Sequence, residues 1–201
     1  RCSRDWSSDV CSSDLKTLEF IKNYNSKNDI EESVIVFGLD MLKTVIIEII
    51  IAVVLAIFAG CFWRAMIFLV TLMPLRQYAG GYHTRSRISC AVMSTVIYAL
   101  ELLLLKYVNI WTMWQILGIF IGAFIIILLA PVENRNNPLD TAAQMHFKNR
   151  TRMMLLIDML IFTILVVAHR YDYSFVIFNS VELVAILCIM GYISNKIDER
   201  R

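Results

Sequence analysis

Residues 44–62 read TVIIEIIIAVVLAIFAGCF, and Glu48 is the single charged side chain in this run. An α-helix of that length extends about 28 Å, which is close to the ~30 Å hydrocarbon core of a bilayer. The run is therefore long enough and apolar enough to cross a membrane as a helix.

Five more apolar runs follow along the chain. Four of them have a length similar to the first, and they are residues 88–105, 111–130, 153–168 and 174–194. The fifth run, 65–75, reaches only about 16 Å as a helix. It either borrows residues 60–63 to cross the bilayer or forms a re-entrant segment. The polar turns at 106–110 and 169–173 are short, so they predict two helical hairpins.

The composition agrees with a chain whose solvent is largely lipid. Of 201 residues, 58% are hydrophobic and 18% are charged, whereas soluble domains have about 45–50% and about 25%. The net charge of +2 is too small to predict a nucleic-acid partner. These values exclude a disordered chain, a soluble nucleic-acid-binding domain and a compact aqueous enzyme. We expect an all-α, polytopic integral membrane bundle of about six membrane segments.

The segment before the first run carries two helical patterns. Apolar residues recur at helical spacing in 15–24 and again in 30–41, which predicts N-terminal amphipathic helices at the membrane interface. Residues 1–15 are polar and repeat the triplet SSD. We interpret them as a disordered tail or an artefact of the sequence and leave their two cysteines out of any site. Residues 16–201 are interpreted as one membrane-embedded domain.

Basic side chains are distributed unevenly between the two ends of the predicted helices. Outside residues 1–15, fourteen of them precede the first run, occupy the loops at 76–87 and 135–152, or end the chain. The turns on the opposite side hold Arg64, Lys106 and Arg170. Because basic loops remain in the cytoplasm, six crossings place both termini and both polar loops on the cytoplasmic side.

The polar loop at residues 76–90, RQYAGGYHTRSRISC, carries the residue types that covalent peptide chemistry requires. A cysteine nucleophile needs an imidazole base and donors for the oxyanion, and Cys90 and His83 fit these roles. In one continuous helix the two residues would lie about 10.5 Å apart along the axis, beyond hydrogen-bond reach. The chain must therefore turn back between them, and Gly80 and Gly81 permit the backbone angles for such a turn.

A helix that begins near Ile88 places Cys90 in its first turn, where the helix dipole stabilises a thiolate. Arg85 and Arg87 act in the same direction. Each residue also has an ordinary interpretation: a small apolar cysteine, an interfacial His83, a simple glycine turn, and arginines that anchor to lipid headgroups. No histidine or cysteine pair has metal-ligand spacing, so we expect no metal and no other cofactor.

Three blocks of the sequence are specific enough to compare with known families: RQYAGGYHTRSRISC (76–90), VFGLDMLKT (36–44) and APVENRNNPLD (130–140). Together they resemble the AgrB family of membrane cysteine endopeptidases, which process the AgrD propeptide in bacterial quorum sensing. The resemblance covers residues 16–201 and includes Arg76, Gly81, His83 and Cys90 in the family's order.

The resemblance implies a chemistry, partners and a location. Cys90 would attack a peptide bond in the C-terminal part of a membrane-bound AgrD-type propeptide, with His83 as the base. An internal Cys or Ser of the peptide would then attack the acyl-thioester and close a thiolactone or lactone ring. Arg76, Arg85 and Arg87 would suit the acidic tail of the propeptide. The implied location is the bacterial cell membrane, with the active-site loop in the cytoplasm. The implied partners are the propeptide and lipid, and no nucleic acid is expected. We also expect a homodimer.

Two other functions stay open from the sequence. In a membrane transporter or exporter of peptides, Glu48, Glu101 and Asp158 would line a pathway. In a non-catalytic membrane scaffold, none of the polar loop residues would have a chemical role. Replacement of Cys90 by alanine separates the peptidase from both.

Overall fold

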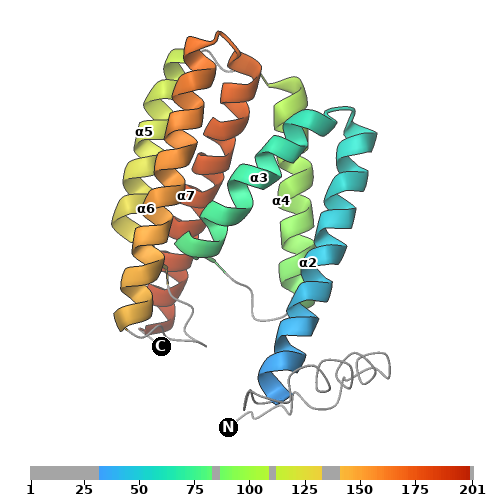
Figure 1. The fold of residues 1–201 in the computed structure, drawn as a ribbon, viewed down its shortest axis with the longest axis vertical. Coiled ribbons are helices and arrows are strands. Elements are labelled where there is room, and N and C mark those ends of the chain that lie inside the picture. Colours follow the sequence, from blue (N-terminus) through green and yellow to red (C-terminus); the bar gives the residue numbers. More distant parts are fainter. Residues whose placement is uncertain (1–31, 83–86, 109–111, 133–140, 200–201) are drawn as a thin grey trace, which may run out of the picture. The chain divides into compact units, whose positions relative to one another are not determined.

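The computed structural model describes residues 32–82, 87–108, 112–132 and 141–199 (Figure 1). Within these residues the regular elements are six helices: α2 (Glu32–Ala59), α3 (Phe62–Ala79), α4 (Arg87–Tyr107), α5 (Thr112–Leu129), α6 (Thr141–Val167) and α7 (Tyr171–Glu199). The chain divides into two units, residues 1–50 and 51–201, and the boundary falls inside α2. The predicted all-α fold class is confirmed, and each predicted apolar run lies almost entirely within one helix.

Helix α2 joins two segments that the sequence pattern predicts separately. It runs without interruption along its length, so the predicted amphipathic segment 30–41 continues directly into the first membrane run. The helix ends at Gly60, whose φ of +71° lies in the region that glycine adopts without steric strain. The other predicted amphipathic helix, 15–24, and the tail 1–15 lie outside the described residues.

Helix α3 contains the shortest predicted run and is longer than that run. Its 18 residues extend about 27 Å, because Phe62, Trp63 and Arg64 precede the run and residues 76–79 follow it. The first turn of α3 contacts the ends of α4 and α7, while Ala79 contacts the segment after α5. Leu105 lies before α5 and Val132 lies after it, so the two contacts of α3 are about one helix length apart. Helix α3 therefore passes from one end of unit 51–201 to the other. This arrangement favours a crossing helix over a re-entrant segment.

Four helices are long and apolar enough to cross a membrane, over residues 42–59, 89–107, 112–129 and 171–197. Helices α3 and α6 are not among these four; α3 has arginines near both ends, and α6 begins with a basic stretch. The predicted run at 153–168 forms the second half of α6. A short turn then leads into α7, which packs against α6, so the predicted hairpin at this position is confirmed.

Helix α7 lies at the centre of unit 51–201 and packs against α3, α4, α5 and α6 (Figure 1). Of its span, 56% is buried inside the protein, against 11–28% in the other three spans. Fully buried side chains along α7 include Val176, Ile177, Val181, Val184 and Cys188. The outer helices therefore leave most of their apolar surface exposed, as expected where lipid replaces water.

Two glycines of α5, Gly118 and Gly122, allow the close approach of α7. A Cβ atom added to Gly118 would lie 2.5 Å from the ring of Phe178, and one added to Gly122 would lie 2.8 Å from the Glu182 carboxylate. Their spacing of four residues places both on one face of α5. This is the small-xxx-small pattern by which membrane helices pack closely.

We expect Gly118→Leu to destabilise the bundle by about 1–3 kcal/mol, because the larger side chain overlaps Phe178 and forces α5 away from α7. The measurement is the thermal unfolding midpoint of the purified protein in detergent. Leu117→Phe is the control, since it enlarges an exposed neighbour on the same helix. Equal midpoints for the two variants would show that the α5–α7 contact does not depend on Gly118.

Candidate functional site

The turn that follows α3 is held by an arginine of the same helix. Arg76 lies in the last turn of α3, and its Nη1 donates a hydrogen bond to the carbonyl of Gly80. Its Nη2 donates to the carbonyl of Tyr82 over 2.8 Å. The planar guanidinium presents several donors in a fixed fork, so one side chain holds two carbonyl groups two residues apart. We call residues 80–82, held in this way, the Arg76 turn.

Both glycines of the Arg76 turn adopt backbone angles that other residues avoid. The φ angle is +72° at Gly80 and +129° at Gly81. A side chain at Gly80 would overlap the carbonyl oxygen of Val132, and one at Gly81 would overlap the Arg76 guanidinium. Both positions of this turn therefore require glycine. The reversal predicted between His83 and Cys90 falls on residues 83–86, outside the described residues, and stays a prediction.

The Arg76 turn joins the two polar loops of the sequence. Gly80 forms an isolated parallel β-bridge with Val132, and the Val132 amide donates to the Ala79 carbonyl over 2.9 Å. Val132 belongs to the block at 130–140 that follows α5. The two loops that the distribution of basic residues assigns to one side of the membrane therefore meet at one end of the unit.

Helix α7 forms the surface on which the Arg76 turn lies. The Tyr82 amide donates to the Leu187 carbonyl over 3.0 Å. A Cβ atom added to Gly191 would lie 2.7 Å from the carbonyl carbon of Gly81 and 3.0 Å from Val132. The small size of Gly191 thus lets the turn and Val132 approach the helix, a role that the sequence analysis did not assign.

Cys90 lies in the first turn of α4, as the sequence predicts. Its side chain is half-buried, and Cys61, Cys90 and Cys188 are all thiols rather than disulfides. Cys188 of α7 lies beside the end of α3, where its thiol approaches the Ala79 carbonyl oxygen to 4.0 Å.

The structure does not reach the whole predicted site. His83 and Arg85 lie in the segment 83–86, outside the described residues, and only the backbone of Arg87 is described, as the start of α4. Contact between the imidazole of His83 and the thiol of Cys90 stays a prediction. The described part of the chain contains no group of His, Cys, Asp or Glu side chains suited to holding a metal.

Several carboxylates lie within the helices, away from water. Asp158 of α6 is 4% exposed, and Asp158, Glu101 and Glu182 each have one buried oxygen without a hydrogen-bond partner in the described residues. Glu182 lies against Gly122 of α5. Their burial agrees with the rule that intramembrane carboxylates face the bundle interior.

Comparison with known proteins identifies relatives over most of the chain. The family model described as Accessory gene regulator B (AgrB) matches residues 15–191. The chain is 27% identical to an AgrB-like protein of Clostridium perfringens (strain SM101 / Type A) over 186 residues, which cover 86% of each chain. It is 30% identical to AgrB-like protein 2 of Clostridium perfringens (strain 13 / Type A) over 126 residues, covering 59% of this chain and 58% of the relative. No solved structure matches the chain.

We expect Arg76→Lys to loosen the Arg76 turn, because an ammonium group cannot hold both carbonyls in the geometry of the guanidinium fork. Hydrogen–deuterium exchange of the purified protein should show amide exchange at residues 79–82 at least about tenfold faster than in the parent, since about 1.4 kcal/mol of local stability is lost. Arg152→Lys, on an exposed position of α6, is the matched control and should leave exchange at the turn unchanged. Unchanged exchange in Arg76→Lys would contradict the role of the guanidinium.

Proposed function

The chain belongs to the AgrB family, and from that premise we propose that it is a membrane cysteine endopeptidase that cleaves and cyclises an AgrD-type propeptide. Family membership supports a role in the agr quorum-sensing system. Four helices suited to crossing a bilayer support a membrane location. The peptidase chemistry, the residues that perform it and the propeptide partner are the proposal.

In the proposed reaction, His83 accepts the proton of the Cys90 thiol, and the thiolate attacks the carbonyl carbon of the scissile peptide bond. His83 then gives the proton to the departing amine, the C-terminal tail leaves, and an acyl-thioester remains on Cys90. A Cys or Ser side chain within the bound peptide attacks this thioester, and its proton returns to the Cys90 sulfur. The products are a thiolactone or lactone ring and the regenerated thiol.

Ring closure must compete with hydrolysis of the thioester. Exchange of one thioester for another is close to neutral in energy, so exclusion of water decides which product forms. Cys90 is half-buried at the end of an apolar helix, and the adjacent turn is packed on α7. Both features favour a site with limited access for water.

The observation that carries the proposal is the Arg76 turn. It ends at Tyr82, the residue before His83, and it is attached to α7, α3 and Val132. A turn fixed in this position supports the return of the chain from His83 towards the first turn of α4, which the proposed proton transfer requires.

The geometry divides the arginines of the loop into two roles. Both terminal nitrogens of Arg76 donate to backbone carbonyls, so we assign Arg76 to positioning the turn. Arg85 and Arg87 are then the side chains proposed to bind the acidic tail of the propeptide. The sequence leaves Arg76 either a substrate-binding or a supporting role, and we propose the supporting one.

We also propose that the loop faces the cytoplasm and that the protein acts as a homodimer. The charge distribution along the sequence supports the orientation. Arg64 lies near Leu105 and Asp172 at one end of the unit, and Gly80 lies beside Val132 at the other end. These positions support an even number of membrane crossings between the two polar loops.

We expect Cys90→Ala to lower propeptide cleavage by about four orders of magnitude or more, because the covalent step is lost. The measurement is conversion of a co-expressed propeptide, with the amount of each variant in the membrane determined in parallel. Cys61→Ala is the matched control, since this second half-buried thiol lies before α3 at the other end of the unit.

His83→Gln should abolish cleavage in the same assay, whereas Cys61→Ala should retain it. Normal cleavage by Cys90→Ala, at the membrane level of the parent, would reject the peptidase in favour of a transporter or scaffold.

A further inference from the structure

The start of α3, the end of α4 and the start of α7 meet at the end of unit 51–201 opposite the Arg76 turn. Arg64, at the start of α3, connects them: its Nη1 donates to the Leu105 carbonyl of α4 over 3.0 Å, and its Nη2 donates to the Asp172 carboxylate of α7 over 3.0 Å. A guanidinium has five N–H donors, so these two contacts fix its orientation and leave further donors for a ligand. Arg64 is therefore a preorganised cation rather than a mobile surface side chain.

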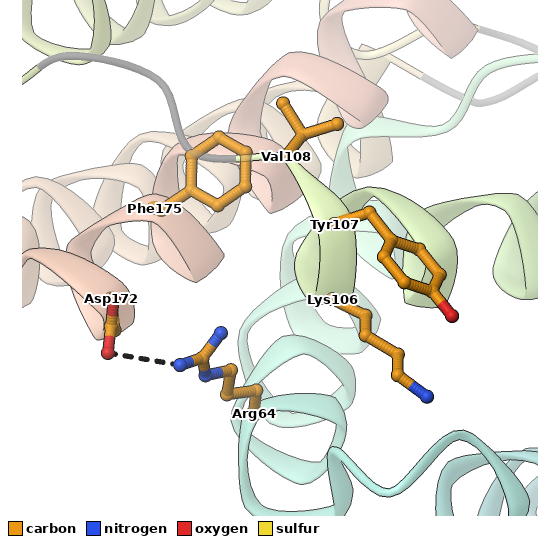
Figure 2. A pocket seen from close by; sticks show the side chains of 6 residues that line it. All are labelled: Arg64, Lys106, Tyr107, Val108, Asp172 and Phe175. Atoms are coloured by element: carbon orange, nitrogen blue, oxygen red, sulfur yellow. Dashed lines mark hydrogen bonds and ion pairs between the residues drawn. The ribbon is translucent and has the colours of Figure 1, made fainter.

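A cavity of about 160 Å³ opens at this junction (Figure 2). Its lining residues are Arg64, Lys106, Tyr107, Val108, Asp172 and Phe175. Figure 2 shows Asp172 and Lys106 on opposite sides of the Arg64 guanidinium. The cavity thus combines two cations, one carboxylate and an apolar wall.

The charges of the cavity do not cancel. Asp172 forms an ion pair with Arg64, whereas Lys106 lies with its amino group 5.4 Å from the centre of the Tyr107 ring. Within the described residues no carboxylate forms an ion pair with Lys106. The lining therefore keeps one uncompensated positive charge, which favours an anion.

Aromatic side chains place this end of the unit at the membrane surface. Trp63, Tyr107 and Trp114 are 71%, 73% and 63% exposed, and Tyr171 is also exposed. All four lie within the first or last turns of helices α3, α4, α5 and α7. Exposed Trp and Tyr collect at the headgroup level of a bilayer, so the cavity lies at the depth of lipid headgroups.

We propose that this cavity binds the phosphate of an anionic phospholipid headgroup. The N–H donors of Arg64 that Leu105 and Asp172 leave unused can bind a phosphate oxygen, and the positive charge of Lys106 adds a longer-range attraction. Val108, which is 39% exposed, supplies an apolar surface for the glycerol. Asp172 competes with the phosphate for Arg64 and therefore limits the affinity. Free inorganic phosphate is also negatively charged and has the same kind of hydrogen-bond acceptors as the headgroup. The exposed aromatic side chains near the cavity favour a lipid as the source of the bound phosphate.

The test measures binding of phosphatidylglycerol to the full chain in mild detergent by native mass spectrometry, with phosphatidylcholine and inorganic phosphate as comparison ligands. Lys106→Gln should weaken phosphatidylglycerol binding about fivefold, the effect of one cation at a membrane surface. Lys196→Gln is the matched control, because Lys196 also lies over a tyrosine ring, at 5.7 Å from that of Tyr192, in α7 away from the cavity. This control should bind like the parent.

Asp172→Asn provides a change in the opposite direction, because it removes the carboxylate that competes for Arg64. It should bind phosphatidylglycerol more tightly than the parent. The unfolding midpoint of each variant without added lipid shows whether it is folded; if Asp172→Asn fails to fold, the comparison of Lys106→Gln with Lys196→Gln decides the question.

Equal weakening in Lys106→Gln and Lys196→Gln would overturn the proposal, since it would indicate nonspecific attraction to positive charge. Equal binding of phosphatidylglycerol and phosphatidylcholine would also overturn it. Inorganic phosphate that occupies the cavity as tightly as the lipid would overturn the assignment to a headgroup.

Discussion

The hydrogen bonds from Arg76 to the carbonyls of Gly80 and Tyr82 are the contact on which the candidate site depends. Backbone groups outside a helix need partners within the protein when lipid surrounds it. Arg76 supplies two of these partners from the helix that the chain has just left. With the turn fixed, Gly80 can pair with Val132 and Tyr82 can bond to Leu187.

These contacts make α7 part of the site, although α7 contributes none of the proposed catalytic side chains. The helix supplies the Leu187 carbonyl and the space above Gly191, and its other faces hold α3, α5 and α6. The same packing that stabilises the bundle therefore positions the chain leading to His83. At the other end of the unit, Arg64 joins α3, α4 and α7 in a comparable way.

The length and helical spacing of the apolar runs predicted the helices well. Most of the chain has lipid as its solvent, so the same apolar pattern applies from one helix to the next. The helical content, the α6–α7 hairpin and the place of Cys90 in the first turn of α4 all follow from local sequence. The packing of the Arg76 turn on Gly191 does not, since the partners are more than 100 residues apart in the sequence. The sequence likewise leaves the role of Arg76 open between binding the substrate and supporting the site, because it does not show which carbonyls a guanidinium meets.

The central helix of the bundle is also the last of the six in chain order. During synthesis α3 and α5 enter the membrane before α7 exists, so the surfaces of Gly118 and Gly122 first meet lipid or another protein. The residues before His83 gain their anchor only when Leu187 has emerged. The Arg76 turn thus takes its position only after α7 has been synthesised, later than the helices that precede it in the chain.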